Sequence, residues 1–457
     1  MIWLSLVLSD VAVAQQGRPD AEPENEPDAL VELDAGEGYA DDKDTEIKNP
    51  NSIETDLNTS FPHTGAVFGG AIPEEFFDWK KGLYAKHGLK LAFSYQSLYQ
   101  NSSDSGGVLL GPSTVDTAWG GWAVAELKWK AINRGGDFEG SLVASLDWRH
   151  TFGSHQDPAF LQVDIGSLWP TDFVYLSWDP WFANLYWEQK FKKDQVKNTG
   201  FVLRVGTQVA AQFIDFFRFK DSRTSFSGGP FTIAPTSIPN PPPGLGTSFR
   251  WSPASGSPLY VSGTINDMNA EAGEWSWDNA FDYGQFFYAM EVGYNWRRSP
   301  GDFDHLHLLT FYADKKDTQL PVFPNESGGG FKVLGSKQWD RIVGFGSYTY
   351  NTAEGGGFGV TFAEHTLNAG VALQRPLGIR GEVALGATWM DPIDNMFLPT
   401  LPAGTQLEEQ YGFELYWKLL LTPDFWITPQ IQYIIDPTFN PTTNSILIPG
   451  LKFRFFL

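Results

Sequence analysis

Apolar and polar residues alternate with a period of two along most of the chain, which is the pattern of β-strands that bury one face. In residues 140–149, leucine, alanine and tryptophan occupy one face, whereas serine, aspartate and arginine occupy the other. Gly, Pro, Asn or Asp bounds most of these segments, and no long helical pattern separates them. The alternation predicts fifteen strands, over residues 88–100, 118–132, 138–152, 171–179, 184–191, 200–210, 258–266, 285–297, 303–314, 338–352, 365–376, 379–390, 408–421, 424–434 and 445–456.

One short amphipathic helix is predicted immediately before the first strand, over residues 73–88. Pro73 opens it, acidic residues occupy its first turn, Lys86 and His87 occupy its last, and Gly88 ends it. We expect its apolar face to consist of Phe76, Trp79, Leu83 and Tyr84.

The alternation by itself leaves two architectures open. In a soluble barrel or sandwich the apolar face points inward, whereas in a transmembrane barrel it meets lipid and the polar face lines a wet lumen. Most segments reach the roughly 9–11 residues that a membrane-crossing strand needs. The last segment places Leu451, Phe453 and Phe455 opposite Lys452 and Arg454, as expected for a lipid-facing strand.

Tryptophans near the segment ends also favour the membrane, because aromatic girdles form at both lipid–water interfaces. We therefore predict an all-β fold, a transmembrane antiparallel β-barrel. Single-chain bacterial barrels have even strand numbers, so sixteen strands, with one undetected, complete it. The tryptophans concerned are Trp119, Trp122, Trp129, Trp178, Trp181, Trp296, Trp339, Trp417 and Trp426.

The composition excludes several other classes of protein. Against 54 Asp and Glu the 457 residues contain 32 Lys and Arg, a net charge of −22, so no nucleic-acid partner is expected. No run of about 20 apolar residues is present to form a membrane-spanning helix. The absence of cysteine excludes disulfide scaffolds, thiolate zinc sites and cysteine nucleophiles.

Three segments follow from the distribution of charge and hydrophobicity. Residues 1–16 resemble a secretory signal peptide, with an apolar stretch before small residues, although the positive start is missing. Residues 17–71 are acidic, and 14 acidic residues against two lysines between positions 20 and 56 predict disorder. Residues 72–457 contain the short helix followed by the barrel.

The C-terminal quarter contains a series of short motifs, Glu414-Leu415-Tyr416-Trp417, Leu421-Thr422-Pro423, Thr428-Pro429-Gln430-Ile431-Gln432-Tyr433-Ile434, Asp436-Pro437 and Gly450-Leu451-Lys452-Phe453. With the helix-to-strand entry at residues 83–91, these motifs make residues 73–457 similar to the carbohydrate-selective outer-membrane porins of the OprB type. The resemblance implies a sixteen-stranded barrel in the outer membrane of a Gram-negative-type envelope. It also implies a constricted lumen through which small sugars diffuse passively. Outer-membrane barrels often end in Phe, whereas this chain ends in Leu457.

Charged residues at inward-facing positions in mid-segment are the candidate sugar-binding residues. Arginine offers a planar fork of donors to sugar hydroxyls and carboxylates offer acceptors. The family is known for arginines and carboxylates at its narrowing, and Asp147 and Arg149 match that pattern best. Solvation of a wide vestibule is the alternative role for each residue. The candidates are Glu126, Lys128, Asp147, Arg149, Glu188, Lys190 and Arg204.

We expect no catalytic residue, cofactor or metal, because the usual nucleophile, zinc and phosphate-binding motifs are missing. His305 and His307 share one strand face, but the sequence identifies no third ligand. The proline-rich segment 220–258 is a long loop that could enter the lumen or cover the outer mouth.

The leading hypothesis is a sugar channel, with small sugars and outer-membrane lipid as its partners. Alternatives are a channel for organic acids or amino acids, a barrel-embedded hydrolase, and an envelope-anchoring protein that uses the acidic segment. Both a monomer and a homotrimer are compatible with the sequence.

Overall fold

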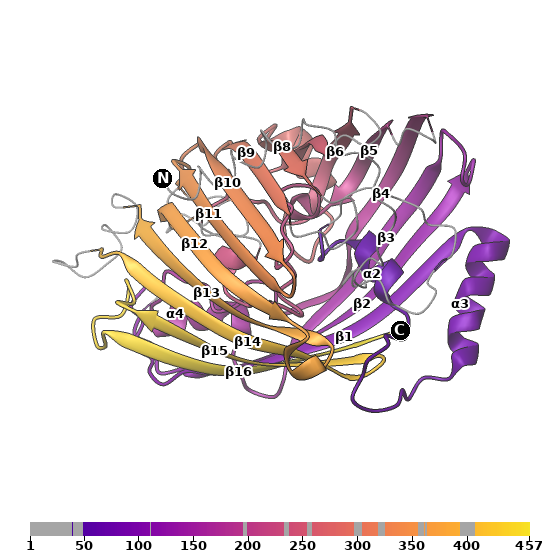
Figure 1. Ribbon diagram of the computed structural model, residues 1–457. Coiled ribbons are helices and arrows are strands. Elements are labelled where there is room, and N and C mark those ends of the chain that lie inside the picture. The colour runs from indigo at the N-terminus through magenta and orange to yellow at the C-terminus, as the bar shows by residue number, and fades with distance from the viewer. Residues whose placement is uncertain are drawn as a thin grey trace, which may run out of the picture. The chain divides into compact units, whose positions relative to one another are not determined.

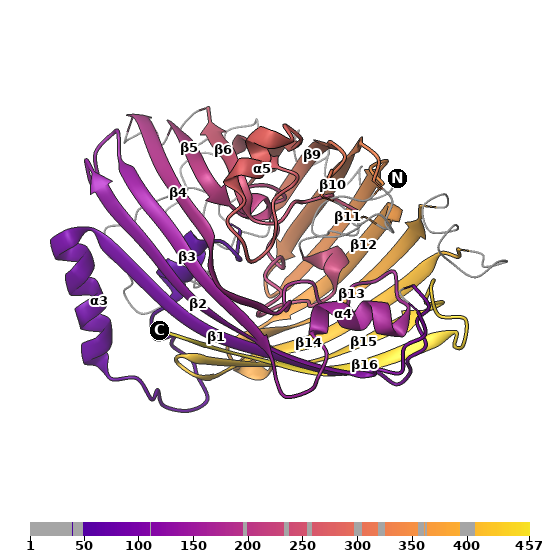
Figure 2. The same cartoon turned by 180° about the vertical axis from the view of Figure 1, so that it is seen from behind.

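A closed barrel forms most of the described part of the chain. The chain divides into two units, Met1–Val31 and Glu32–Leu457, and the first lies outside the described residues. In the second, sixteen antiparallel strands form a closed barrel in which β1 (Leu89–Asn101) pairs with β16 (Ser445–Phe456), as Figure 1 and Figure 2 show from opposite sides. Closure leaves no strand edge unpaired. The computed structural model describes residues 39, 49–109, 111–194, 199–232, 237–253, 258–296, 304–318, 325–354, 361, 363–393 and 407–457.

Each strand pairs with its neighbours in the sequence. The strands between β1 and β16 are β2 (Thr117–Ile132), β3 (Gly140–Thr151), β4 (Trp178–Asp194), β5 (Thr199–Gln208), β6 (Gly244–Ser252), β7 (Leu259–Asp267), β8 (Phe286–Asn295), β9 (His305–Ala313), β10 (Gly328–Trp339), β11 (Ile342–Asn351), β12 (Ala363–Gln374), β13 (Gly381–Pro392), β14 (Gln410–Thr422) and β15 (Phe425–Ile435). The helices are α2 (Ile53–Thr59), α3 (Glu74–His87), α4 (Pro158–Ile165) and α5 (Trp277–Asp282), with 3-10 helices η1 (Ala210–Gln212), η2 (Gly229–Phe231) and η3 (Pro376–Gly378).

The predicted sixteen-stranded antiparallel barrel is confirmed, although three strands differ from the prediction. The predicted strand 171–179 is wrong, because residues 171–177 belong to the connection before β4, whereas the predicted strand 184–191 is part of β4, which runs from Trp178 to Asp194. Strand β6 was not predicted and lies within the expected long loop, and β10 was missed except at its end. The total of sixteen is therefore right, but two strands were missed and one predicted strand, 171–179, is not present.

The barrel is apolar outside and polar inside, the reverse of a soluble protein. Along β8 the side chains of Tyr288, Met290 and Val292 are exposed, whereas Glu291 and Asn295 are buried. The last strand follows the same rule, with Leu451 outward and Lys452 and Arg454 inward. This arrangement is that of a barrel whose outer wall meets lipid. Among the described residues, no helix has the length and apolar character needed to cross a membrane.

The tryptophans follow the girdle prediction only in part. Trp129 and Trp339 lie on the outer wall near strand ends and are 46% and 50% exposed. Trp122 instead lines an internal cavity, and Trp181 is buried. These tryptophans lie near strand ends, as predicted. Successive side chains of a strand point to opposite faces, however, so the position of each tryptophan along its strand decides whether its indole faces lipid or the lumen.

Helix α3 forms as predicted, while its buried face differs from the expected one. Gly88 ends the helix in the left-handed conformation, with φ of 71°. The buried side chains are Phe77, Lys80 and Tyr84, and Trp79 is half exposed. The prediction is confirmed for Tyr84 and for Phe76, which packs against the same cluster, but it is wrong for Trp79. Lys80 was not expected on this face, and its ammonium donates to the carbonyl and the hydroxyl of Ser60.

The connections differ at the two ends of the barrel. One end has tight turns such as residues 340–341 and 423–424, whereas the other has long connections such as 152–177 and 209–243. The described part of 209–243, which we call the lumen loop, is almost entirely buried. Its aromatic residues Phe217, Phe219 and Phe226 pack against Phe345 of the inner wall. Of the two positions that the sequence left open, the loop takes the one inside the barrel (Figure 2).

The N-terminal segment also differs from the prediction. The signal peptide predicted at 1–16 and most of the acidic segment 17–71 lie outside the described residues. Residues 49–71 have a defined structure, so disorder was the wrong prediction for this part. Helix α2 lies within the ring of strands (Figure 1), where Ile53 and Leu57 pack with Val143, Tyr186 and Phe213.

Candidate functional site

All seven predicted site residues project into the barrel, and each is at least nine-tenths buried. They lie on adjacent strands, two each on β2, β3 and β4 and one on β5. Because these strands pair in sequence order and the residues share inward parity, alternation alone was sufficient to place them on the lumen wall. The structure brings them into three ionic groups rather than one.

The first group is built around Glu188. This residue pairs across the sheet with Arg204, whose Nε donates to Glu188 Oε2 at 2.8 Å. Lys128 Nζ donates to Glu188 Oε1 at 2.7 Å, and Lys190 Nζ lies 3.8 Å from the same oxygen. Lys128 also contacts Glu54 of helix α2 through a hydrogen-bonded ion pair. The three cations of the wall are thus matched by one acid of the wall and one acid of the internal helix.

The second group fastens helix α2 to the lumen loop and to the last strand. Asp56 of α2 accepts hydrogen bonds from Nη2 of Arg223 at 3.1 Å and from Nη2 of Arg454 at 2.7 Å. Both arginines also bond Asp221. Although burial by itself raises the pKa of Asp221, Arg223 and Arg454 lower it to about 2. The wall residue Glu126 borders this group, interacting with Asp56 and Arg223.

The third group holds Arg149 in a fixed orientation. Its Nη2 donates to Asp147 Oδ2 at 3.1 Å, and its Nη1 donates to the Val174 carbonyl. The guanidinium carbon lies 3.9 Å from the centroid of a Trp122 ring and 3.8 Å from that of a Trp178 ring. Cation–π contact on both sides adds to the ion pair and restricts the side chain. The predicted pairing of Asp147 with Arg149 is present.

Two internal cavities adjoin these groups. The larger has an empty volume of about 680 Å³, open solvent included, and is lined by Trp122, Glu126, Asp147, Arg149, Asn184 and Arg223, among others. The smaller has an empty volume of about 290 Å³, measured in the same way, and its lining includes Asp56, Ser60, Glu126, Trp426 and Arg454.

Glu126 lines both cavities. Asp56 and Arg454 line only the smaller one, and Asp221 and Arg223 line only the larger, so this acid–arginine group lies between them. A solute that crosses the lumen here would meet paired charges, amides and the indoles of Trp122 and Trp426.

Several residues of this site were not anticipated. Arg223 lies in the lumen loop, and Glu54 and Asp56 lie in a segment expected to be disordered. Nothing local in the sequence connects them to the wall. Arg454 could have been found, since its inward parity on the last strand was already evident. Lys128, Glu188, Lys190 and Arg204 line neither of the two cavities, whereas Glu126, Asp147 and Arg149 do.

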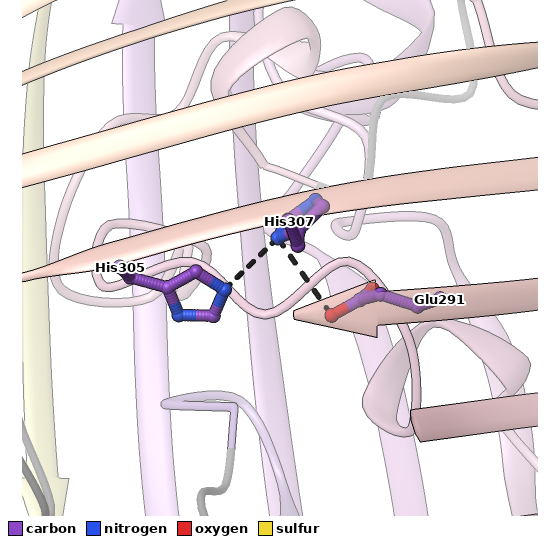
Figure 3. A group of neighbouring side chains, drawn as sticks. All are labelled: Glu291, His305 and His307. Carbon is purple, nitrogen blue, oxygen red and sulfur yellow. Dashed lines mark hydrogen bonds and ion pairs between the residues drawn. The ribbon is translucent and has the colours of Figure 1, made fainter. Parts of the chain in front are cut away.

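One group in the described part of the chain has donors suited to a metal ion. It contains Glu291, His305 and His307, all buried on the inner wall (Figure 3). The two histidines share the strand face predicted from their spacing, and Glu291 of the neighbouring strand β8 is the third donor that the sequence did not identify.

The closed barrel, apolar outside and charged within, has the architecture of a porin. Comparison with solved structures agrees. The high-pH structure of Pseudomonas putida OprB superposes with a TM-score of 0.63 at 12% identity, covering 83% of this chain and 97% of that one. The low-pH structure of the same porin gives a TM-score of 0.46 at 11% identity, covering 84% and 98%. No family model and no curated protein matches the sequence. The resemblance expected from the C-terminal motifs is therefore confirmed at the level of the fold.

Proposed function

We propose that this protein is an outer-membrane channel through which small carbohydrates diffuse passively. The observation that supports it is the charge balance of the larger cavity. Three acidic and three basic residues line that cavity, so its formal charge is zero. The acids are Glu126, Asp147 and Asp221, and the bases are Arg149, Lys220 and Arg223.

A balanced set of fixed charges suits a neutral, hydroxyl-rich solute. Arginine forks donate to hydroxyls and carboxylates accept from them, so hydrogen bonds lost to water are exchanged without selecting one ion sign. Trp122 adds an apolar face against which a sugar ring can lie. An organic-acid channel would require an excess of positive charge at this point, and the lining residues do not provide one. Binding in such a channel must remain weak enough for release.

Solute flux into liposomes tests the proposal. Barrels reconstituted in vesicles should admit a neutral hexose faster than the corresponding sugar acid of similar size. Arg149→Ala should lower hexose flux, because the guanidinium is fixed between two indoles at the cavity wall. Arg134→Ala, which removes an arginine in the exposed turn between β2 and β3, is the matched control and should leave flux unchanged.

Two results would contradict the proposal. The first is equal or faster entry of the sugar acid, which would favour the organic-acid channel. The second is the absence of sugar flux through barrels whose folding has been verified by circular dichroism. Hydrolysis of an ester substrate, abolished by a single serine substitution, would support the barrel-embedded hydrolase instead.

The same vesicles test the membrane location and the assembly. The apolar outer wall makes lipid the expected surroundings, and insertion into preformed vesicles measures that directly. Chemical cross-linking within the membrane distinguishes a monomer from a homotrimer.

A further inference from the structure

A polar cluster on strands β8 and β9 has no part in the sugar path proposed above. Glu291, His305 and His307 point toward one another on the inner wall (Figure 3), and none of them lines either cavity. His307 Nδ1 lies 3.1 Å from His305 Nε2 and 3.7 Å from Glu291 Oε1. Such a cluster on the inner face of a membrane barrel needs an explanation, because buried polar groups are costly unless they are satisfied.

These distances suit a shared metal ion. Zinc binds imidazole nitrogen and carboxylate oxygen at about 2.0–2.2 Å, so two ligands in tetrahedral geometry lie about 3.3 Å apart. The 3.1 Å and 3.7 Å separations bracket that value, and one donor atom from each residue lies within 4.8 Å of the others. Two histidines with one glutamate are also a donor set that zinc uses in known sites.

The surroundings orient the donors as a metal site requires. Asp215 Oδ1 of the lumen loop lies 3.3 Å from His307 Nε2. With the proton of His307 on Nε2 facing this carboxylate, Nδ1 presents its lone pair to His305 and Glu291. A carboxylate behind a ligating histidine is the usual way in which proteins fix the ring and its tautomer.

Tyr260 occupies the remaining side of the cluster. Its hydroxyl lies 2.9 Å from His305 Nε2 and donates to Glu291. The ring reaches this position because it crosses Gly293, where an added Cβ would lie 2.1 Å from Tyr260 Cζ. Gly293 pairs directly with His307 across the sheet. The glycine therefore leaves the space that lets the Tyr260 hydroxyl join the group as a fourth polar side chain.

We propose that Glu291, His305 and His307 bind one divalent transition-metal ion of the zinc class. The ion would fasten the lumen loop to the barrel wall, because Asp215 contacts both His307 and, through its backbone N–H, the carboxylate of Glu291. Lys220 and Lys332 pair with Asp215 at 3.4 Å and 2.9 Å and oppose a second cation. Removing one of these ammonium groups should therefore strengthen metal binding.

Equilibrium dialysis of the tag-free, full-length barrel with Zn²⁺ alone tests the proposal. The expected result is one equivalent per chain, with Ca²⁺ not retained because it prefers oxygen ligands. His307→Gln and Glu291→Gln should each weaken Zn²⁺ binding by at least about tenfold, as disruption of a coordination shell does. His155→Gln, at an exposed loop position, should bind as the unaltered protein does.

Lys332→Gln distinguishes a specific site from adventitious binding. This variant should bind Zn²⁺ more tightly than the unaltered protein. Weaker or unchanged binding would contradict the electrostatic argument. Co²⁺ added to the unaltered barrel should give the intense visible absorption of tetrahedral coordination, a measurement that does not depend on any variant folding. Failure to retain Zn²⁺ stoichiometrically, or equal retention by His307→Gln, would overturn the proposal. No measurement here involves sugar transport, so the result is independent of the proposed channel function.

Discussion

Replacing Asp56 by asparagine tests whether helix α2 closes the lumen between the two cavities. Asp56 is 3% exposed and bonds Arg223 of the lumen loop and Arg454 of β16. It lines the smaller cavity, while Glu126, with which it interacts, lines both. The substitution keeps the size of the side chain and removes only its charge. If the ion pairs hold α2 in place, Asp56→Asn should let the helix leave its position.

The magnitude follows from the burial of the group. Removing one partner of a buried ion pair costs about 3–5 kcal/mol, because the remaining charge is left without its counterion. Asp221 continues to bond both arginines, so the lower value of about 3 kcal/mol applies here. Since each 1.36 kcal/mol changes an equilibrium tenfold, the ratio of displaced to seated helix should rise about 150-fold.

Single-channel recording in planar bilayers measures that change. Asp56→Asn should show longer or more frequent high-conductance openings, and Glu54→Gln, which removes the charge that pairs with Lys128, should add to the effect. Asp78→Asn on the exposed side of α3 removes the same charge outside the lumen and is the control. Conductance and gating identical in Asp56→Asn and the unaltered protein would refute the reasoning, provided that both insert as folded barrels.

Three further substitutions test separate parts of the structure. Burial lowers the pKa of Lys80 from 10.5 to about 7, so between these pH values the folded state binds fewer protons than the unfolded state. The free energy of unfolding should therefore rise with pH across that range. Lys80→Met should abolish this dependence when unfolding is measured at pH 6, 8 and 10. Gly293→Ala should cost about 1–3 kcal/mol in unfolding free energy by displacing Tyr260, whereas Gly335→Ala, whose nearest new contact is 3.5 Å, should not. Trp122→Ala should lower sugar flux more than ion conductance, and equal losses would mean that the indole only shapes the pore.

The alternation predicted most of the barrel because residues that face lipid are apolar and residues that face the lumen are polar. It failed where the side chains do not show this difference. Strand β10 begins with three glycines, which have no side chain to show a face, and β6 is short and follows a proline-rich stretch. The first residues of β4 were not joined to the strand predicted at 184–191, because Pro180 interrupts the alternation. The structure accommodates that interruption with register shifts between β3 and β4, which sequence periodicity cannot represent.

The candidate site was predictable only for the residues that the wall supplies. Parity places a side chain on the lumen face, but it does not say which distant segment will meet it. Asp56 meets Arg223 across 167 positions and Arg454 across 398. For the same reason the sequence did not show that Glu291 lies beside the two histidines, although it is on the adjacent strand. Pairwise spacing identifies groups on one strand, whereas these groups are assembled by barrel closure and by the inserted loop.

The acidic segment shows why composition misled the prediction at this point. A sequence rich in acids and poor in apolar residues is expected to be disordered, since in water it cannot bury enough surface to offset the entropy of ordering. That argument assumes that the segment has only water to bind. Here the wall and loop present Lys128, Arg223 and Arg454, which would be costly to bury without counterions. The acids of α2 supply those counterions, so the negative charge that predicts disorder for the isolated segment is what orders residues 53–59 inside the barrel.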